Sequence, residues 1–153
     1  MNTYDLLKRL RREATPFRIE DIEARLFAVR KTQAENTLPL HKLLIYNYES
    51  FLALQRAIPN GTPMPVNEKK LREMETELDN YMTMHLPGDE NYKAFIRIVS
   101  VYLTFIARKP LHPPGMLNEN GQAIYRDGIA VCSLRIEEIT KPSSLCRFCV
   151  STI

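Results

Sequence analysis

The chain contains no tryptophan, only five glycines and only three cysteines in 153 residues. It also lacks a phosphate-binding glycine loop, the H-E-x-x-H pair of zinc proteases and the G-x-S-x-G turn of many hydrolases. Without these motifs the sequence gives no support for the nucleotide-binding or hydrolytic sites that they mark. No reaction is indicated by the residues.

Long hydrophobic runs are also missing. The most apolar stretch, residues 94–107, contains Arg97 and is shorter than the roughly 20 residues that a membrane-spanning helix needs. The N-terminal segment has no uninterrupted apolar core of the kind found in signal peptides. We therefore expect a cytoplasmic protein without membrane association. Thiols stay reduced in that compartment, where clustered cysteines more often serve metal or redox chemistry than structural disulfides.

Positive charge is only slightly in excess, with a formal net charge of +3. A nucleic-acid-binding composition would show a denser basic stripe, so we do not expect a nucleic-acid partner. Lys8, Arg9, Arg11 and Arg12 could contact an anionic partner, but the outer face of a first helix is the simpler interpretation. The sequence leaves open whether a protein partner exists and which oligomer forms.

The apolar residues recur mostly at intervals of three and four, which predicts helices. We expect five, over about residues 3–13, 18–35, 38–58, 68–85 and 90–108. Asn67 and Asp89 are suitable N-caps for the last two. The expected buried positions include Leu6, Leu7, Leu10, Phe51, Leu54, Ile58, Leu71, Met74, Leu78, Tyr81 and Met82. The acidic residues expected to form a solvated face of the fourth helix are Glu73, Glu75, Glu77 and Asp79.

The fifth predicted helix differs from the others. Its polar residues form one narrow stripe, made of Lys93, Arg97, Ser100 and Thr104. Since nearly all of its remaining surface is apolar, we expect this helix to lie at the centre of the fold.

The pattern changes after Lys109. Pro113 and Pro114 prevent a helix there, and Asp127-Gly128 predicts a hairpin that pairs residues near Ile124 with Ile129 or Val131. The sequence thus predicts a mainly α fold: an antiparallel bundle of about five helices with a small C-terminal β-hairpin or irregular lobe. We expect one domain, 1–153, with a helical body at 1–109 and a Cys/His lobe at 110–153.

All the cysteines fall in this predicted lobe. His112, Cys132, Cys146 and Cys149 follow the spacing H-x19-C-x13-C-x2-C. Three cysteines and one histidine are an established tetrahedral ligand set for structural zinc. A C-x-x-C pair offers two sulfurs on one tight turn, so the four residues are candidate zinc ligands. An iron–sulfur cluster would belong to the same metal interpretation, although its usual set of four cysteines is missing.

Two other interpretations of these residues stay open. Cysteine is among the most buried residue types, so the three thiols could be inert core residues. Cys146 and Cys149 could instead be a redox or nucleophilic pair, although no βαβ pattern accompanies them. His112 could simply be a loop histidine, and His85 is a reserve fourth ligand.

The C-terminal third resembles a family of uncharacterised archaeal proteins that is classed as a domain of unknown function. The matching features are the YLTFI run, the H-P turn followed by a glycine, a cysteine after a strand, and a closing C-x-F-C. These positions are Tyr102, His112, Pro113, Gly115, Cys132, Cys146, Phe148 and Cys149. The chain departs from the family pattern at MLNENGQ, after Gly115, and at Ser133, where a proline is expected.

The resemblance implies a mostly helical fold and an archaeal cytoplasm, but neither an activity nor a metal. Our first hypothesis is a non-enzymatic, regulatory or binding protein with a C-terminal zinc site. The alternatives are a thiol-based redox protein or enzyme that uses Cys146 and Cys149, and a structural interaction domain with inert thiols.

Overall fold

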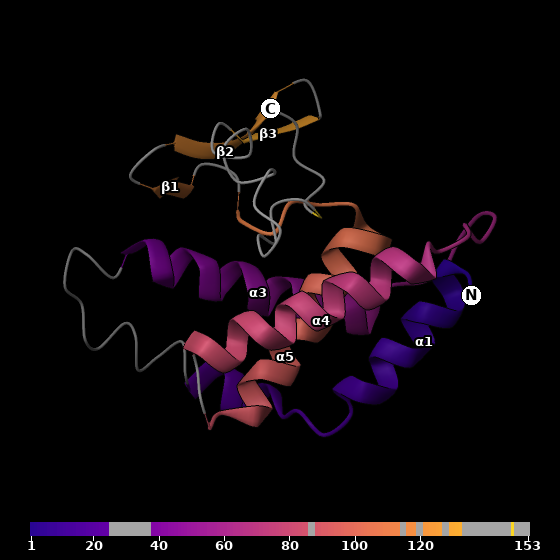
Figure 1. Ribbon diagram of the computed structural model, residues 1–153, viewed down its shortest axis with the longest axis horizontal. Coiled ribbons are helices and arrows are strands. Elements are labelled where there is room, and N and C mark those ends of the chain that lie inside the picture. The colour runs from indigo at the N-terminus through magenta and orange to yellow at the C-terminus, as the bar shows by residue number, and fades with distance from the viewer. Residues whose placement is uncertain are drawn as a thin grey trace.

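A computed structural model describes residues 1–24, 38–85, 88–113, 116–118, 121–126, 129–132 and 148. The predicted fold class is confirmed, since this part of the chain is mainly helical (Figure 1). The helices are α1 (Thr3–Ala14), α3 (Leu38–Arg56), α4 (Glu68–His85) and α5 (Glu90–Tyr102), which the π-helical turn η2 (Leu103–Ala107) continues. Residues 19–24 are helical as well, and the remainder of the predicted second helix lies outside the described residues.

Side-chain caps fix where three of the helices begin. Asn2 and Asp5 form a reciprocal capping box at the start of α1. The side chain of Asn67 accepts a hydrogen bond of 3.1 Å from the backbone N–H of Lys70, and that of Asp89 accepts one of 3.1 Å from Tyr92. Each cap satisfies a backbone donor that has no partner inside the helix. The predicted N-caps Asn67 and Asp89 are therefore confirmed.

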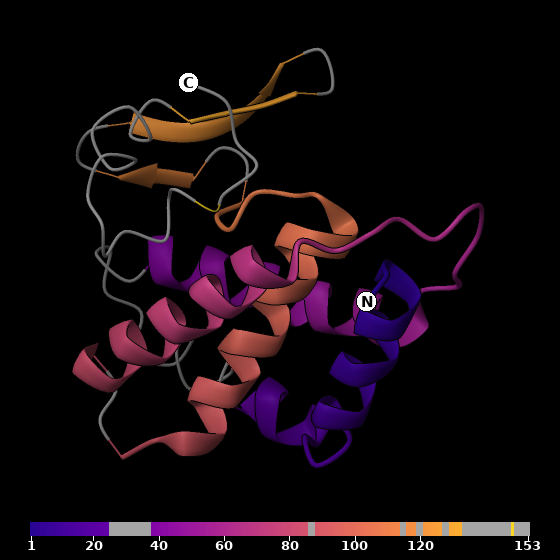
Figure 2. The ribbon, with the colours of Figure 1, turned by 45° about the vertical axis from the view of Figure 1, so that its right-hand side comes forward.

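Helix α5 lies at the centre of the helical body, where it contacts α1, α3 and α4 (Figure 2). Phe95, Val99 and Tyr102 are 4%, 1% and 8% exposed, and Phe105 is partly buried against the same apolar cluster. The apolar face of α1 completes this cluster, because Leu6, Leu7 and Leu10 are buried in it. The predicted central position of this helix is confirmed.

Two of the positions expected in the core are exposed instead. Ile58 is 85% exposed, because α3 ends at Arg56 and the residue falls in the connector that follows. Tyr81 is 46% exposed on α4, while the neighbouring Leu78 and Met82 are buried. A tyrosine can keep its hydroxyl group in water while its ring contacts apolar residues. A tyrosine that continues a pattern of apolar residues is therefore only a weak indication of burial.

The end of α5 is irregular: the helical segment reaches Ala107, in agreement with the predicted end at about residue 108, but its last turn is not α-helical. After Tyr102 the α-helix gives way to the wider π-helical turn η2. Arg108 then takes a left-handed conformation with φ of 52°, and the backbone N–H of Lys109 donates to the carbonyl of Leu103 at 2.9 Å. Pro110 follows and cannot continue a helix, since it has no N–H group.

The described residues of the C-terminal lobe include a three-stranded antiparallel sheet in the order β1-β2-β3. Its strands are β1 (Met116–Asn118), β2 (Gly121–Arg126) and β3 (Ile129–Cys132), and they lie to one side of the helices, with β1 against α3 (Figure 2). Ile124 pairs with Val131, and Arg126 with Ile129. This is the pairing that the hairpin prediction requires. The turn residues Asp127 and Gly128 themselves lie outside the described part.

A membrane-spanning segment was not expected, and the described part of the chain contains no helix with both the length and the apolar character to cross a bilayer.

Candidate functional site

His112 stands on a segment that is fastened to the helical body. The phenol of Tyr46 in α3 donates a hydrogen bond of 2.6 Å to the carbonyl oxygen of Pro110. Pro110 is fully buried, and Leu111 packs against the apolar cluster. These two contacts position the backbone immediately before His112.

The His112 side chain lies at the surface and keeps an exposed area. Desolvation by the surrounding protein nevertheless lowers the pKa of its imidazole from the ordinary value of 6.5. Its neutral form is therefore favoured near pH 7, and the neutral imidazole is the form that binds metal ions.

The predicted cysteine ligands are described only in part. Cys132 is the last residue of β3, with its backbone opposite Ala123. Its side chain lies outside the described part, as do Cys146 and Cys149 altogether. The residues that the structure describes contain no group of three or more histidine, cysteine, aspartate or glutamate side chains that could hold a metal ion. The convergence of the four predicted ligands therefore stays a prediction.

Phe148, between the last two cysteines, is described and is 3% exposed. Its side chain belongs to the same apolar cluster as the buried residues of α1, α3, α4 and α5. The C-terminal tail is thus attached to the helical body at the middle of its C-x-F-C segment. The sequence does not predict this, because a lone phenylalanine between two cysteines shows no periodicity.

A second polar site lies between the helices, where four charged side chains join three of them. Arg97 in α5 donates to Glu13 in α1 at 3.0 Å and lies 3.8 Å from Glu75 in α4. Arg9 in α1 pairs with the same Glu75, and its Nε lies 3.5 Å from Glu13. Two guanidinium groups and two carboxylates balance one another in this network. Glu75 therefore does not belong to a merely solvated face, as the acidic spacing suggested, whereas Asp79 is exposed as expected.

The basic stretch in α1 is used within the fold as well. Arg11 donates from Nε to the carbonyl oxygen of Leu54 at 3.1 Å, and from its guanidinium to that of Ala57. These carbonyls stand at the C-terminal end of α3, where backbone acceptors lack partners inside the helix. Since Arg9 belongs to the ion network, only Lys8 and Arg12 of these four basic residues are exposed. This supports the structural interpretation over an anion-binding patch.

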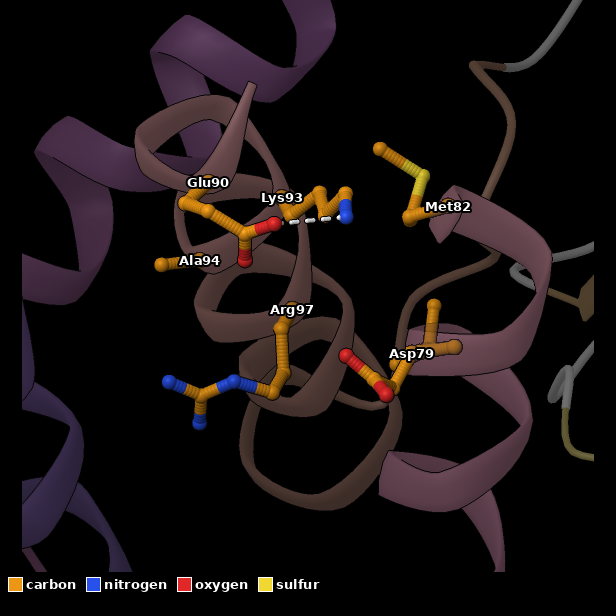
Figure 3. A pocket seen from close by; sticks show the side chains of 7 residues that line it. Asp79, Met82, Glu90, Lys93, Ala94 and Arg97 are labelled. Carbon is orange, nitrogen blue, oxygen red and sulfur yellow. Dashed lines mark hydrogen bonds and ion pairs between the residues drawn. The ribbon is translucent and has the colours of Figure 1, made fainter. Parts of the chain in front are cut away.

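A pocket of about 190 Å³ opens beside the ion network, between the end of α4 and the start of α5 (Figure 3). Lys93 and Arg97 line it from α5, and Asp79 lines it from α4. The sequence predicts both cations on the polar stripe of this helix but gives no sign of a cavity. The one feature of the sequence that could have indicated the pocket is Lys93, a lysine at a position that an otherwise apolar helix would bury.

Comparison with known proteins finds relatives along the whole chain. Residues 2–152 match the family model described as an uncharacterised protein conserved in archaea, DUF2115. A UPF0305 protein of Methanothermobacter thermautotrophicus is 28% identical over 157 residues, which cover 99% of this chain and 96% of the relative. A UPF0305 protein of Methanocaldococcus jannaschii is 27% identical over 158 residues, which cover 98% and 95%.

No solved structure matches the chain. No related structure therefore adds to the fold described above, and the matching family is described as uncharacterised, without an activity. On the family model, which spans nearly all of its residues, the chain belongs to the DUF2115 family of uncharacterised proteins conserved in archaea.

Proposed function

We propose that this chain is a non-catalytic regulatory or binding protein whose C-terminal lobe is held together by one zinc ion. The proposed ligands are His112, Cys132, Cys146 and Cys149. The observation that carries the proposal is the burial of Phe148, which is 3% exposed in the core of the helical body. It supports a site at the junction of the lobe and the body, because the tail is attached there by the residue that separates the C-x-x-C pair.

The chemistry of the four side chains is suited to zinc. Three thiolates and one neutral imidazole complete a tetrahedral coordination shell. Cys149 follows Phe148 directly, and Cys146 precedes it by two residues, so their Cα atoms lie within roughly 7 Å of the buried residue. Three thiolates around Zn²⁺ leave one net negative charge, which the adjacent Arg147 would partly offset. No ligand position would remain open for water, and we therefore propose a structural rather than a catalytic ion.

Such an ion would stabilise a lobe for which the sequence predicts little core of its own. Binding free energy at a structural zinc site is also folding free energy, since the unfolded chain has no preformed site. We expect the lobe to loosen when the metal is removed, while the helical body remains folded around its own apolar cluster.

Metal analysis of untagged protein tests the proposal. We expect about one zinc per chain, with X-ray absorption showing sulfur ligands at about 2.3 Å and a nitrogen at about 2.0–2.1 Å. Cys149→Ser and His112→Gln should each lower the zinc content after dialysis against a chelator. His41→Gln is the matched control, and His85→Gln tests the reserve ligand.

Two results would contradict the zinc site. A metal-free protein in which Cys146 and Cys149 form a reversible disulfide would favour the redox alternative. A metal-free protein whose three thiols all react slowly with a thiol reagent until it unfolds would favour inert core residues. If His85→Gln lowers the zinc content and His112→Gln does not, His85 takes the place of His112 in the ligand set. The proposed function would stay the same.

A further inference from the structure

The pocket between α4 and α5 has an apolar base and a charged rim. Leu78 and Met82 are 1% and 6% exposed and form the buried side of the cavity together with Ala94. Its volume is about 190 Å³. The space is suited to a small organic molecule.

The rim carries charged side chains from both helices: Lys93 with its partner Glu90 on α5, and Asp79 on α4. Figure 3 shows the Lys93 ammonium extending from α5 toward α4, and the Asp79 carboxylate extending from α4 toward α5. The Arg97 guanidinium points away from both and pairs with Glu13 and Glu75 in the ion network. Asp79 is exposed and makes no ion pair with the other residues that the structure describes. The ammonium of Lys93 therefore forms the positive wall of the pocket, and the carboxylate of Asp79 forms its negative wall.

Lys93 is held at the positive wall in an unusual position for a lysine. Its side chain is only 9% exposed, and its ammonium lies 2.8 Å from Glu90 Oε1 and 3.4 Å from Thr83 Oγ1. An ammonium has three N–H donors, so these two contacts leave one for a ligand. Glu90 is itself 79% exposed, and such surface ion pairs are weak. A carboxylate entering the pocket can therefore replace Glu90 as the partner of Lys93.

From this arrangement we propose that the pocket binds a small zwitterion of the size and charge pattern of an α-amino acid. Its carboxylate would be bound by Lys93, and its ammonium by Asp79. A simple anion would meet the carboxylate of Asp79 without compensation, and a simple cation would meet the ammonium of Lys93. Only a ligand with both charges pairs with both walls, while its aliphatic part contacts Leu78 and Met82.

Titration of ¹⁵N-labelled full-length protein with three probes tests this inference. L-Alanine carries both charges, propionate lacks the ammonium, and ethylamine lacks the carboxylate. We expect L-alanine to shift the backbone amide resonances of residues 78–82 and 90–97 in a saturable manner. The two single-charge probes should bind about tenfold or more weakly, because each loses one charge-assisted hydrogen-bonding group.

Variants on α4 separate the proposed ligand from general charge effects. Asp79→Asn should weaken L-alanine about tenfold or more and leave propionate unchanged or tighter. Glu73→Gln removes an exposed carboxylate from the same helix outside the pocket and should change nothing. Both positions are exposed, so both variants should fold.

Several outcomes would overturn the inference. Equal binding of propionate and L-alanine would show a simple anion site on α5. An unchanged L-alanine affinity in Asp79→Asn would show that Asp79 does not take part in binding the ligand. The absence of saturable shifts at the pocket residues with all three probes would show that the cavity holds water alone.

Discussion

The phenol of Tyr46 and the carbonyl oxygen of Pro110 are joined by a hydrogen bond of 2.6 Å across 64 positions of sequence. This bond connects the middle of α3 to the segment that carries His112. Pro110 has no N–H group and is fully buried, so its carbonyl is the only backbone polar group that the residue can use.

Removing this phenol should therefore destabilise the fold. We expect Tyr46→Phe to lower the free energy of unfolding by about 1–2 kcal/mol, because a buried carbonyl loses its donor. Tyr48→Phe is the matched control, since that phenol bonds to Glu23 at the surface and should cost less than about 0.5 kcal/mol. Urea unfolding followed by circular dichroism measures both. Equal losses in the two variants would contradict the assigned role of the Pro110 contact.

Phe148 should be one of the more sensitive positions outside the helices. Truncation to alanine removes a ring from a filled apolar cluster, and we expect Phe148→Ala to cost about 3–5 kcal/mol. Phe148→Leu keeps much of the volume and should cost less, about 1 kcal/mol. If Phe148→Ala unfolds at the same urea concentration as the unsubstituted protein, the tail does not dock on the helical body.

The ion network between α1, α4 and α5 should contribute more to the free energy of unfolding than an exposed ion pair does. Glu75 is 23% exposed and serves both Arg9 and Arg97. We expect Glu75→Gln to cost about 1–2 kcal/mol, between the values for exposed and buried pairs. Glu73→Gln on the solvated side should stay within about 0.5 kcal/mol. The difference between the two variants should shrink in about 1 M salt, which screens exposed charges. A difference that salt leaves unchanged would point to packing instead.

Alkaline pH should weaken the fold through Tyr102. Burial raises the pKa of this phenol above its ordinary value of 10.0. The folded state thus favours the neutral phenol, whose contribution is complete below about pH 10 and is lost as pH rises through the higher folded-state pKa. Comparison of unfolding free energies at about pH 9 and pH 11 should show a smaller decrease in Tyr102→Phe than in the unsubstituted protein. Identical decreases would rule out this phenol as the source.

Arg108 should tolerate glycine better than alanine. Its φ of 52° lies in the left-handed region, which costs a residue with a Cβ atom roughly 1–2 kcal/mol. Glycine avoids that cost, although it also gains freedom in the unfolded chain. We expect Arg108→Gly to be more stable than Arg108→Ala by about 1 kcal/mol in thermal unfolding. The reverse order would mean that another conformation is adopted at this position.

The helical body was predictable because its signals are local. Asn67 and Asp89 are caps that act within three residues of sequence, and the apolar spacing of α1 and α5 reports directly on which face is buried. Ile58 shows where this reasoning ends: the spacing continues past Arg56, but the helix does not. The π-helical turn after Tyr102 also has no periodic signature that differs from that of an α-helix.

The sites depend on distant pairs, which a single sequence does not specify. Glu75 looked like part of a solvated acidic face, and only the packing of three helices shows that Arg9 and Arg97 meet there. The pocket beside Lys93 likewise requires the angle between α4 and α5. For the Cys/His set the sequence supplies the residue types and their spacing, while the geometry that would join them depends on segments far apart in the chain.

The ion pair between Glu13 and Arg97 also has a consequence for synthesis on the ribosome. The two residues are separated by 84 positions, so the first helix is complete long before its charged partner leaves the exit tunnel. At translation rates of about 5–20 residues per second, this interval lasts roughly 4–17 s. During that time the apolar face of Leu6, Leu7 and Leu10 has no α5 to cover it. The nascent chain should therefore depend on chaperones most strongly just before α5 emerges.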